Sequence, residues 1–162
     1  MREIFVRALS GSIYAFAIIG SLLYNEIIFY LILLFFVGLT IFEFQKLINH
    51  ISIFPYIILI IIWGAFIQLD FTFKSYLKFL IIPTLLSHTL LILWLYSEFD
   101  ITKKKFFKNL LSVFYITFSG FFIIYLTEFN IKYNPYVLIL LYTLTWVNNT
   151  FAYIIGTFFG KN

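Results

Sequence analysis

Long apolar runs, each close to the length of a membrane-spanning helix, constrain the fold of this chain more than any other feature. A bilayer core requires a helix of about 20 apolar residues. Charged or turn-forming breaks divide the sequence into about six such runs. They lie near 7–23, 27–47, 53–69, 76–97, 107–127 and 134–158. The pattern predicts an all-α polytopic membrane bundle, with residues 1–162 forming a single transmembrane domain.

The overall composition excludes a soluble protein. Apolar residues make up 63% of the chain and charged residues 11%, against about half and a quarter in soluble domains. The net charge of +4 is spread between the apolar runs and not gathered on a polar domain, so nothing indicates a nucleic-acid partner. The chain has no cysteine and two histidines. This excludes a cysteine-based metal site, and any bound metal is expected to be a hard cation such as Mg²⁺.

The distribution of lysine and arginine predicts the orientation, because cytoplasmic loops of membrane proteins carry more of both. With the N-terminus in the cytoplasm and six spans, eight basic residues fall on the inner side and three on the outer side. The inner set is Arg2, Arg7, Lys46, Lys103, Lys104, Lys105, Lys108 and Lys161, and the outer set is Lys74, Lys78 and Lys132. We therefore expect a cytoplasmic N-terminus, with the last span running toward the cytoplasm.

The last apolar run differs from the others because it contains amides, small residues and aromatic residues together. On a helix, one face of this run would collect polar and small side chains at three- and four-residue spacing. That face comprises Thr145, Asn149, Ala152, Tyr153, Gly156 and Gly160, with Asn148 adjacent. Lipid offers an amide no hydrogen-bond partner, so we expect the asparagines to face protein, water or a ligand. For Gly156 and Gly160 alone, close packing of two membrane helices is an equal alternative.

These residues also carry a family resemblance. The segment Trp146-Val-Asn-Asn-Thr-Phe-Ala-Tyr-Ile-Ile-Gly, followed by Gly160-Lys161, resembles the phosphatidate cytidylyltransferases (CDP-diacylglycerol synthases). That family has Trp-x-Asn-Asp-Thr/Ser-x-Ala-Tyr-x-x-Gly and then Gly-Lys/Arg. The match departs at one position, where Asn149 replaces the family's aspartate. Further similarity lies at Arg7, Ser10-Gly11, Glu43-Phe44 and Asn109 to Tyr115.

The resemblance implies an activity and a set of partners. The family transfers CMP from CTP to phosphatidate, giving CDP-diacylglycerol and pyrophosphate in phospholipid synthesis. The partners expected from it are CTP, phosphatidate, the lipid bilayer and a second copy in a homodimer. It implies a bacterial-type inner (cytoplasmic) membrane, with the active side in the cytoplasm. The substrate-binding residues carried over from it are Asn148, Asn149, Thr150, Tyr153 and Lys161.

The resemblance also implies a Mg²⁺ cofactor whose carboxylate ligands do not lie in this chain. Family members run on past the position of Asn162 through a Ser-Pro-x-Lys-Thr segment and an aspartate-rich signature. An asparagine at position 149 gives a cation a neutral carbonyl where an aspartate would give a negative charge, so metal binding should be weaker. We therefore expect the Mg²⁺ ligands to lie largely outside this chain, assign no metal ligand and no catalytic residue within these 162 residues, and predict no activity of the chain by itself.

Four other positions allow two interpretations each. The Lys103–Lys108 run binds anionic lipid headgroups or is simply a positive-inside loop, and the loop is favoured. His88 takes a direct functional role or is satisfied by a neighbouring hydroxyl or carbonyl. Glu43 pairs with Lys46 one turn later or faces the cytoplasmic cavity of the last span. Arg7 anchors at lipid headgroups or binds a substrate phosphate.

Two further functional classes fit the same apolar runs. A small transporter or channel subunit would place its site at the membrane midplane between repeated, broken helices, and the sequence shows no internal repeat. A non-catalytic membrane scaffold would need only the glycine face and aromatic packing. Genomic sequence beyond codon 162 would distinguish the enzyme from both.

Overall fold

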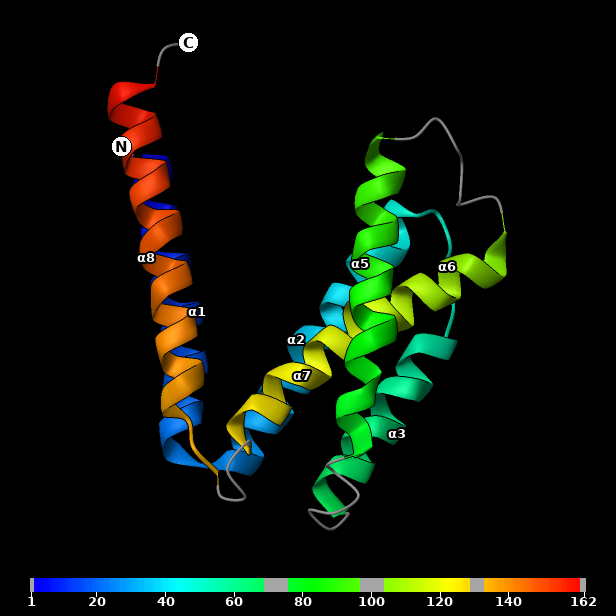
Figure 1. Ribbon diagram of the computed structural model, residues 1–162. Coiled ribbons are helices and arrows are strands. Elements are labelled where there is room, and N and C mark those ends of the chain that lie inside the picture. The colour runs from blue at the N-terminus through cyan, green and yellow to red at the C-terminus, as the bar shows by residue number, and fades with distance from the viewer. Residues whose placement is uncertain (1, 69–75, 97–103, 129–132, 161–162) are drawn as a thin grey trace. The chain divides into compact units, whose positions relative to one another are not determined.

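The computed structural model describes residues 2–68, 76–96, 104–128 and 133–160, without the side chains of residues 2–8 and 10. The described chain is helical throughout and contains no strand, which confirms the all-α prediction (Figure 1). Its elements are α1 (Arg2–Tyr24), α2 (Glu26–Leu47), α3 (Phe54–Gln68), the 3₁₀ turn η1 (Lys78–Leu80), α5 (Ile81–Tyr96), α6 (Lys105–Leu111), the π-helical segment η3 (Ser112–Thr117), α7 (Phe118–Thr127) and α8 (Tyr136–Phe159).

Each predicted apolar run corresponds to one helix or one continuous series of helical segments. Four of them are long and apolar enough to cross a membrane, namely Glu26–Leu47, Lys78–Tyr96, Lys105–Thr127 and Tyr136–Phe159. Two more, Gly11–Tyr24 and Phe54–Gln68, are apolar but shorter. The protein is thus an all-α membrane bundle. The cytoplasmic orientation of its N-terminus stays a prediction.

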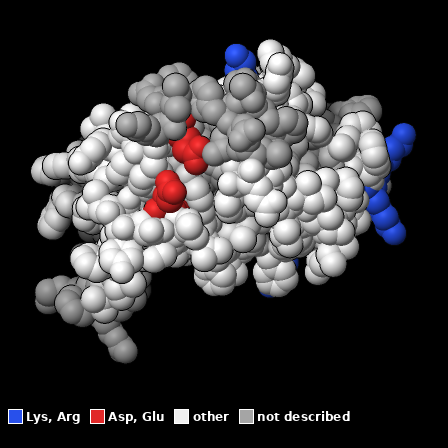
Figure 2. All heavy atoms as spheres, turned by 90° about the horizontal axis from the view of Figure 1, so that it is seen from below, with Lys and Arg blue, Asp and Glu red and all other residues white. Residues whose placement is uncertain are grey.

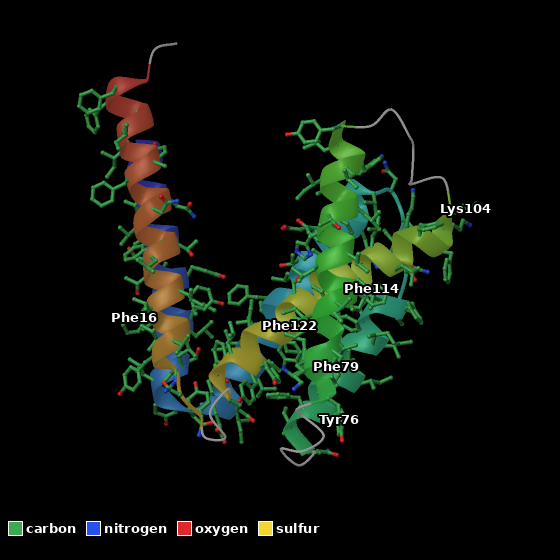
Figure 3. All side chains as sticks on the ribbon, viewed as in Figure 1. Phe16, Tyr76, Phe79, Lys104, Phe114 and Phe122 are labelled. Atoms are coloured by element: carbon green, nitrogen blue, oxygen red, sulfur yellow. The ribbon has the colours of Figure 1, made fainter. Side chains whose placement is uncertain are left out.

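The surface has the character expected of a chain surrounded by lipid. Apolar side chains project outward along the helices, and Phe16 of α1 has 82% of its surface exposed (Figure 3). Most of the face seen in Figure 2 carries neither basic nor acidic side chains, and the basic ones visible there lie at its edges. Hydrocarbon, not water, suits such a surface.

The chain divides into two compact units, each described here by itself. The first combines Met1–Glu26 with Leu126–Asn162, and the second is Ile27–Tyr125. The prediction of a single transmembrane domain stays a prediction.

The first unit pairs α1 with α8, which lie side by side in Figure 1. The link between them is fixed by the segment that precedes α8. The Tyr133 hydroxyl donates a hydrogen bond to the Leu22 carbonyl near the end of α1, at 2.8 Å. The backbone N–H of Asn134 donates to the Thr127 carbonyl at 2.6 Å. Pro135 then serves as the N-cap of α8, in keeping with its fixed φ and missing N–H.

The second unit has an aromatic core. Phe29, Phe66 and Phe121 are fully buried, and Phe66 packs edge-to-face on Phe121 with ring centroids 5.5 Å apart. The indole N–H of Trp63 donates to the Tyr30 carbonyl at 3.1 Å, so a polar atom inside this core has its partner.

Candidate functional site

The polar segment of the last run lies on α8, which is one uninterrupted helix from Tyr136 to Phe159. The helical face expected at Thr145, Asn149 and Tyr153 is therefore formed. All residues of 143–160 are exposed within the described chain, and Leu138 is the buried residue of the helix. The motif thus lies on a helix surface that the rest of the described chain leaves accessible.

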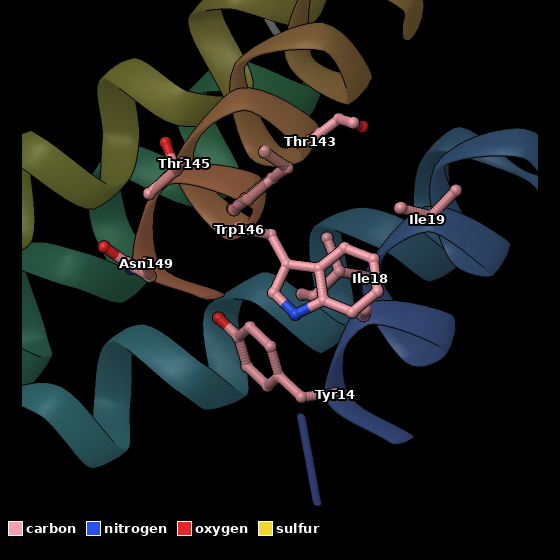
Figure 4. Close-up of a pocket in the computed structure, with 9 residues that line it drawn as sticks. Tyr14, Ile18, Ile19, Thr143, Thr145, Trp146 and Asn149 are labelled. Atoms are coloured by element: carbon pink, nitrogen blue, oxygen red, sulfur yellow. The ribbon is translucent and has the colours of Figure 1, made fainter. Parts of the chain in front are cut away.

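A groove of about 320 Å³ runs beside this surface, between α1 and α8 of the first unit (Figure 4). It is close to the lower end of the volumes typical of small-molecule sites. Figure 4 shows the rings of Trp146 and Tyr14 against the groove, with Asn149 at its edge. The lining residues are Tyr14, Ala15, Ile18, Ile19, Tyr142, Thr143, Thr145, Trp146 and Asn149.

The groove is lined mainly by apolar and aromatic residues, and its other side chains are those of Thr143, Thr145 and Asn149. The hydroxyls of Thr143 and Thr145 each donate to the carbonyl four residues earlier, at 2.8 Å, so their donors are used within the helix. Asn149 makes no side-chain hydrogen bond to any described residue. Its carboxamide therefore supplies the groove with a donor and an acceptor that a ligand can use.

The structure brings only one of the predicted substrate-binding residues, Asn149, into this groove. Asn148, Thr150 and Tyr153 are exposed elsewhere on α8, and the Thr150 hydroxyl donates to the Trp146 carbonyl at 2.8 Å. Lys161 lies outside the described residues. These assignments stay predictions.

The glycines of this helix do not show the close helix packing considered above. A Cβ added at Gly156 would meet nothing within 4 Å among the described residues. One added at Gly160 would meet the Gly156 carbonyl of the same helix end. Helix association through this pair therefore has no support within the described chain.

Sequence reasoning missed the half of the groove that α1 contributes. Tyr14, Ile18 and Ile19 belong to an ordinary apolar run, and nothing in their spacing marks them. The available signal was Gly11, where an added Cβ would lie 3.9 Å from the indole nitrogen of Trp146. Gly11 of α1 therefore lies beside that ring.

The His88 imidazole forms a hydrogen bond with a backbone carbonyl of its own helix. This agrees with the second interpretation of His88, in which a neighbouring hydroxyl or carbonyl satisfies the imidazole. Its Nδ1 lies 2.7 Å from the Thr84 carbonyl, and since a carbonyl only accepts, Nδ1 carries the proton. The imidazole also packs on Tyr115 with ring centroids 4.7 Å apart. A structural role accounts for both contacts.

The predicted pair of Glu43 with Lys46 is wrong. No salt bridge joins these two residues, both of which the structure describes. The ammonium of Lys46 lies over the Phe42 ring instead, 4.3 Å from its centroid. The Phe42 ring lies one helical turn before Lys46. A cation–π contact and an exposed ion pair each contribute a similarly small stabilisation, so the two contacts compete. The side chain of Arg7 lies outside the described residues.

The residues of the groove do not fit a divalent cation. Mg²⁺ is held mainly by carboxylates, and neither α8 nor the groove contains an acidic residue. Among the described residues, no group of three or more His, Asp or Glu side chains could hold a metal ion. What the groove offers is an apolar wall with one amide at its edge.

Comparison with known proteins agrees with the motif on α8. A family model described as the cytidylyltransferase family matches residues 5–162. A search of the curated proteins gave no match, and a search of the solved structures gave none either. The family match covers α8 and the α1 side of the groove. The chain belongs to the cytidylyltransferase family.

Proposed function

We propose that this protein transfers the cytidylyl group of CTP to phosphatidate, producing CDP-diacylglycerol and pyrophosphate. The observation that carries the proposal is the exposed polar surface of α8, on a helix long enough to cross a membrane and beside an apolar groove. Family membership supports the cytidylyl donor. A chain with this much lipid-facing surface favours an acceptor that resides in the membrane.

The acceptor in this proposal is a lipid that bears a phosphate, and the phosphate supplies the nucleophile. A phosphate oxygen of phosphatidate attacks the α-phosphorus of CTP and forms the new P–O bond. The bond from the α-phosphorus to the oxygen that bridges to the β-phosphorus breaks, and pyrophosphate leaves. Such transfer depends on positioning and on stabilising charge at the phosphoryl oxygens.

The residues of this chain would contribute binding and position. The apolar wall of the groove suits acyl chains, and the Asn149 carboxamide at its edge suits a polar group. Asn148, Thr150 and Tyr153 continue the polar surface along α8, and Lys161 would add a cation for phosphate. Mg²⁺, when bound, would neutralise phosphate charge. Its carboxylates must come from outside the groove.

The experiment is a transfer assay on membranes that contain the protein expressed from its complete reading frame. Labelled CTP is supplied with phosphatidate or with diacylglycerol, which lacks the phosphate nucleophile. We expect a labelled lipid with phosphatidate and none with diacylglycerol. We expect the isolated 162-residue chain to give no product, because α8 and its groove hold no carboxylate. Product formation from diacylglycerol, or none from phosphatidate with the complete protein, would overturn the proposal.

The proposal also requires Lys161 to face the cytoplasm, where CTP is found. The chain has no cysteine, so a single cysteine in place of Lys161 can be labelled selectively. A membrane-impermeant maleimide should label it only after the cells are opened. Labelling in intact cells would place it on the outer face and exclude the proposed site.

A further inference from the structure

The end of α2 is tied to the start of α6 by polar contacts within the second unit. The Lys108 ammonium donates to the Ile48 carbonyl at 2.6 Å and lies 3.5 Å from the Asn49 carbonyl. The His50 imidazole Nε2 lies 3.1 Å from the Asn109 side-chain oxygen. These contacts hold the last turn of one membrane-length helix beside the first turn of another.

The backbone at this junction is fixed as well. Asn49 has φ of 50°, the left-handed conformation that ends many helices and that asparagine tolerates. The N–H groups of Asn49 and His50 donate to the carbonyls of Lys46 and Gln45, at 3.1 and 3.0 Å. Lys108 supplies a further donor to the carbonyls of Ile48 and Asn49, which directly follow α2. Backbone and side-chain hydrogen bonds thus both hold this junction.

The start of α6 carries three lysines, Lys104, Lys105 and Lys108, and we call this segment the basic corner. The Lys108 ammonium donates to the Ile48 carbonyl just after α2. Lys104 and Lys105 are exposed, and neither side-chain ammonium makes an ion pair or hydrogen bond with a described residue. Lys104 projects at the end of α6 in Figure 3. Two cations at this helix end are thus left without a protein partner in the described chain.

Exposed aromatic rings adjoin these cations. Phe106 is 68% exposed and Phe107 43% exposed, and their ring centroids lie 6.3 Å apart. They stand in the first turn of the Lys105–Thr127 span, where a membrane helix meets the headgroups. Cations beside exposed rings at that depth suit a surface whose outer layer is anionic and whose inner layer is apolar.

We propose that the basic corner binds the phosphate groups of anionic membrane lipids through Lys104 and Lys105, with Phe106 and Phe107 inserted among the adjoining acyl chains. This site lies in a different unit from the groove, and the proposal does not rest on the transfer reaction. A loop that serves only to orient the chain would also be basic, but it would show no preference between neutral and anionic lipids.

The test measures lipid selectivity on the full-length protein in nanodiscs of phosphatidylcholine that contain a trace of fluorescent phosphatidylglycerol. Energy transfer from the protein's tryptophans reports the lipid bound at its surface. Removing both charges in Lys104→Gln/Lys105→Gln should weaken association with phosphatidylglycerol about 30-fold, or about fivefold for each lysine at low salt. High salt should weaken the wild-type preference, because exposed charges are screened.

Lys78→Gln is the matched control, because Lys78 is also exposed and its ammonium lies 5.5 Å from the Phe79 ring centroid at the start of another span. It should change the association by less than about twofold. Circular dichroism checks that each variant is folded. If the double variant keeps the wild-type preference, or Lys78→Gln reduces it equally, the basic corner is not a lipid site. A shift in topology without loss of selectivity would assign these lysines to orientation alone.

Discussion

Gly120→Ala should destabilise the second unit, because Gly120 of α7 packs directly against Val37 of α2. A Cβ built at Gly120 would lie 2.5 and 2.9 Å from the two methyl carbons of Val37 and 3.3 Å from its Cβ. Ordinary van der Waals contact begins at 3.4 Å. Val37 is buried and β-branched, so rotation about its χ1 is restricted. To remove this clash, the two helices must move apart, which should lower the free energy of unfolding by about 1–3 kcal/mol.

The assay is unfolding in mixed micelles of mild detergent and dodecyl sulfate, followed by circular dichroism. Val37→Ala alone should also destabilise, through lost packing, but it should remove the clash in the Gly120→Ala background. The double-mutant cycle should then give a favourable coupling of about 1 kcal/mol or more. Gly64→Ala is the control, since a Cβ there meets nothing within 4 Å, and alanine should be neutral or favourable by up to about 1 kcal/mol. A Gly120→Ala protein as stable as wild type, or a cycle without coupling, would refute this packing.

Three further predictions address the first unit and the junction after α2. Burial raises the pKa of Tyr133 from 10.0 to about 12, so its contribution to stability is present below pH 10.0 and lost as the pH rises through about 12. In unfolding curves measured over a pH series, Tyr133→Phe should reduce the loss of stability at alkaline pH. If the variant loses as much stability as wild type, this role of Tyr133 is contradicted. Gln45 is fully buried, and its side-chain amide forms hydrogen bonds with the carbonyl and the N–H of Ser52 at 2.8 and 3.3 Å. Gln45→Leu should therefore lower the free energy of unfolding in the micelle assay by about 1–3 kcal/mol. A variant as stable as wild type would show that these hydrogen bonds do not stabilise the junction. Gly11→Leu should crowd the Trp146 ring that lines the groove and raise the KM for phosphatidate but not for CTP, whereas Gly20→Leu, where a Cβ meets nothing within 4 Å, should change neither. Equal effects at the two glycines would rule out the groove as the lipid site.

Helix positions could be predicted from the sequence because hydrophobicity and chain breaks determine them locally. The run predicted at 134–158 became α8 at Tyr136–Phe159, with Pro135 marking its start. The π-helical segment at Ser112–Thr117 had no such signal. Its buried hydroxyls bond only to the backbone, Ser112 to the Lys108 carbonyl and Thr117 to that of Ser112, and threonine and serine occur in straight membrane helices too.

Side-chain partners were harder to predict, because they depend on which helices meet. The motif on α8 was visible as polar residues in an apolar run, but the groove that Trp146 and Tyr14 both line is built from α1 and α8, which are far apart in the sequence. Lys46 had two candidates within one turn, an acid and an aromatic ring, and only the rotamers decide between them. The Lys108 bond to the end of α2 likewise spans a separation that hydrophobic patterning does not report.

The central claim is that the polar surface of α8 binds a phosphorylated substrate, and one matched pair of variants tests it most directly. Thr150 and Thr157 are both exposed, and each hydroxyl donates to the carbonyl four residues earlier at 2.8 Å. Valine at either position should affect the helix equally, but only Thr150 belongs to the motif. In the complete protein, Thr150→Val should lower CTP-dependent labelling of phosphatidate by about tenfold, and Thr157→Val should leave it unchanged. Equal activity of the two variants would contradict the claim.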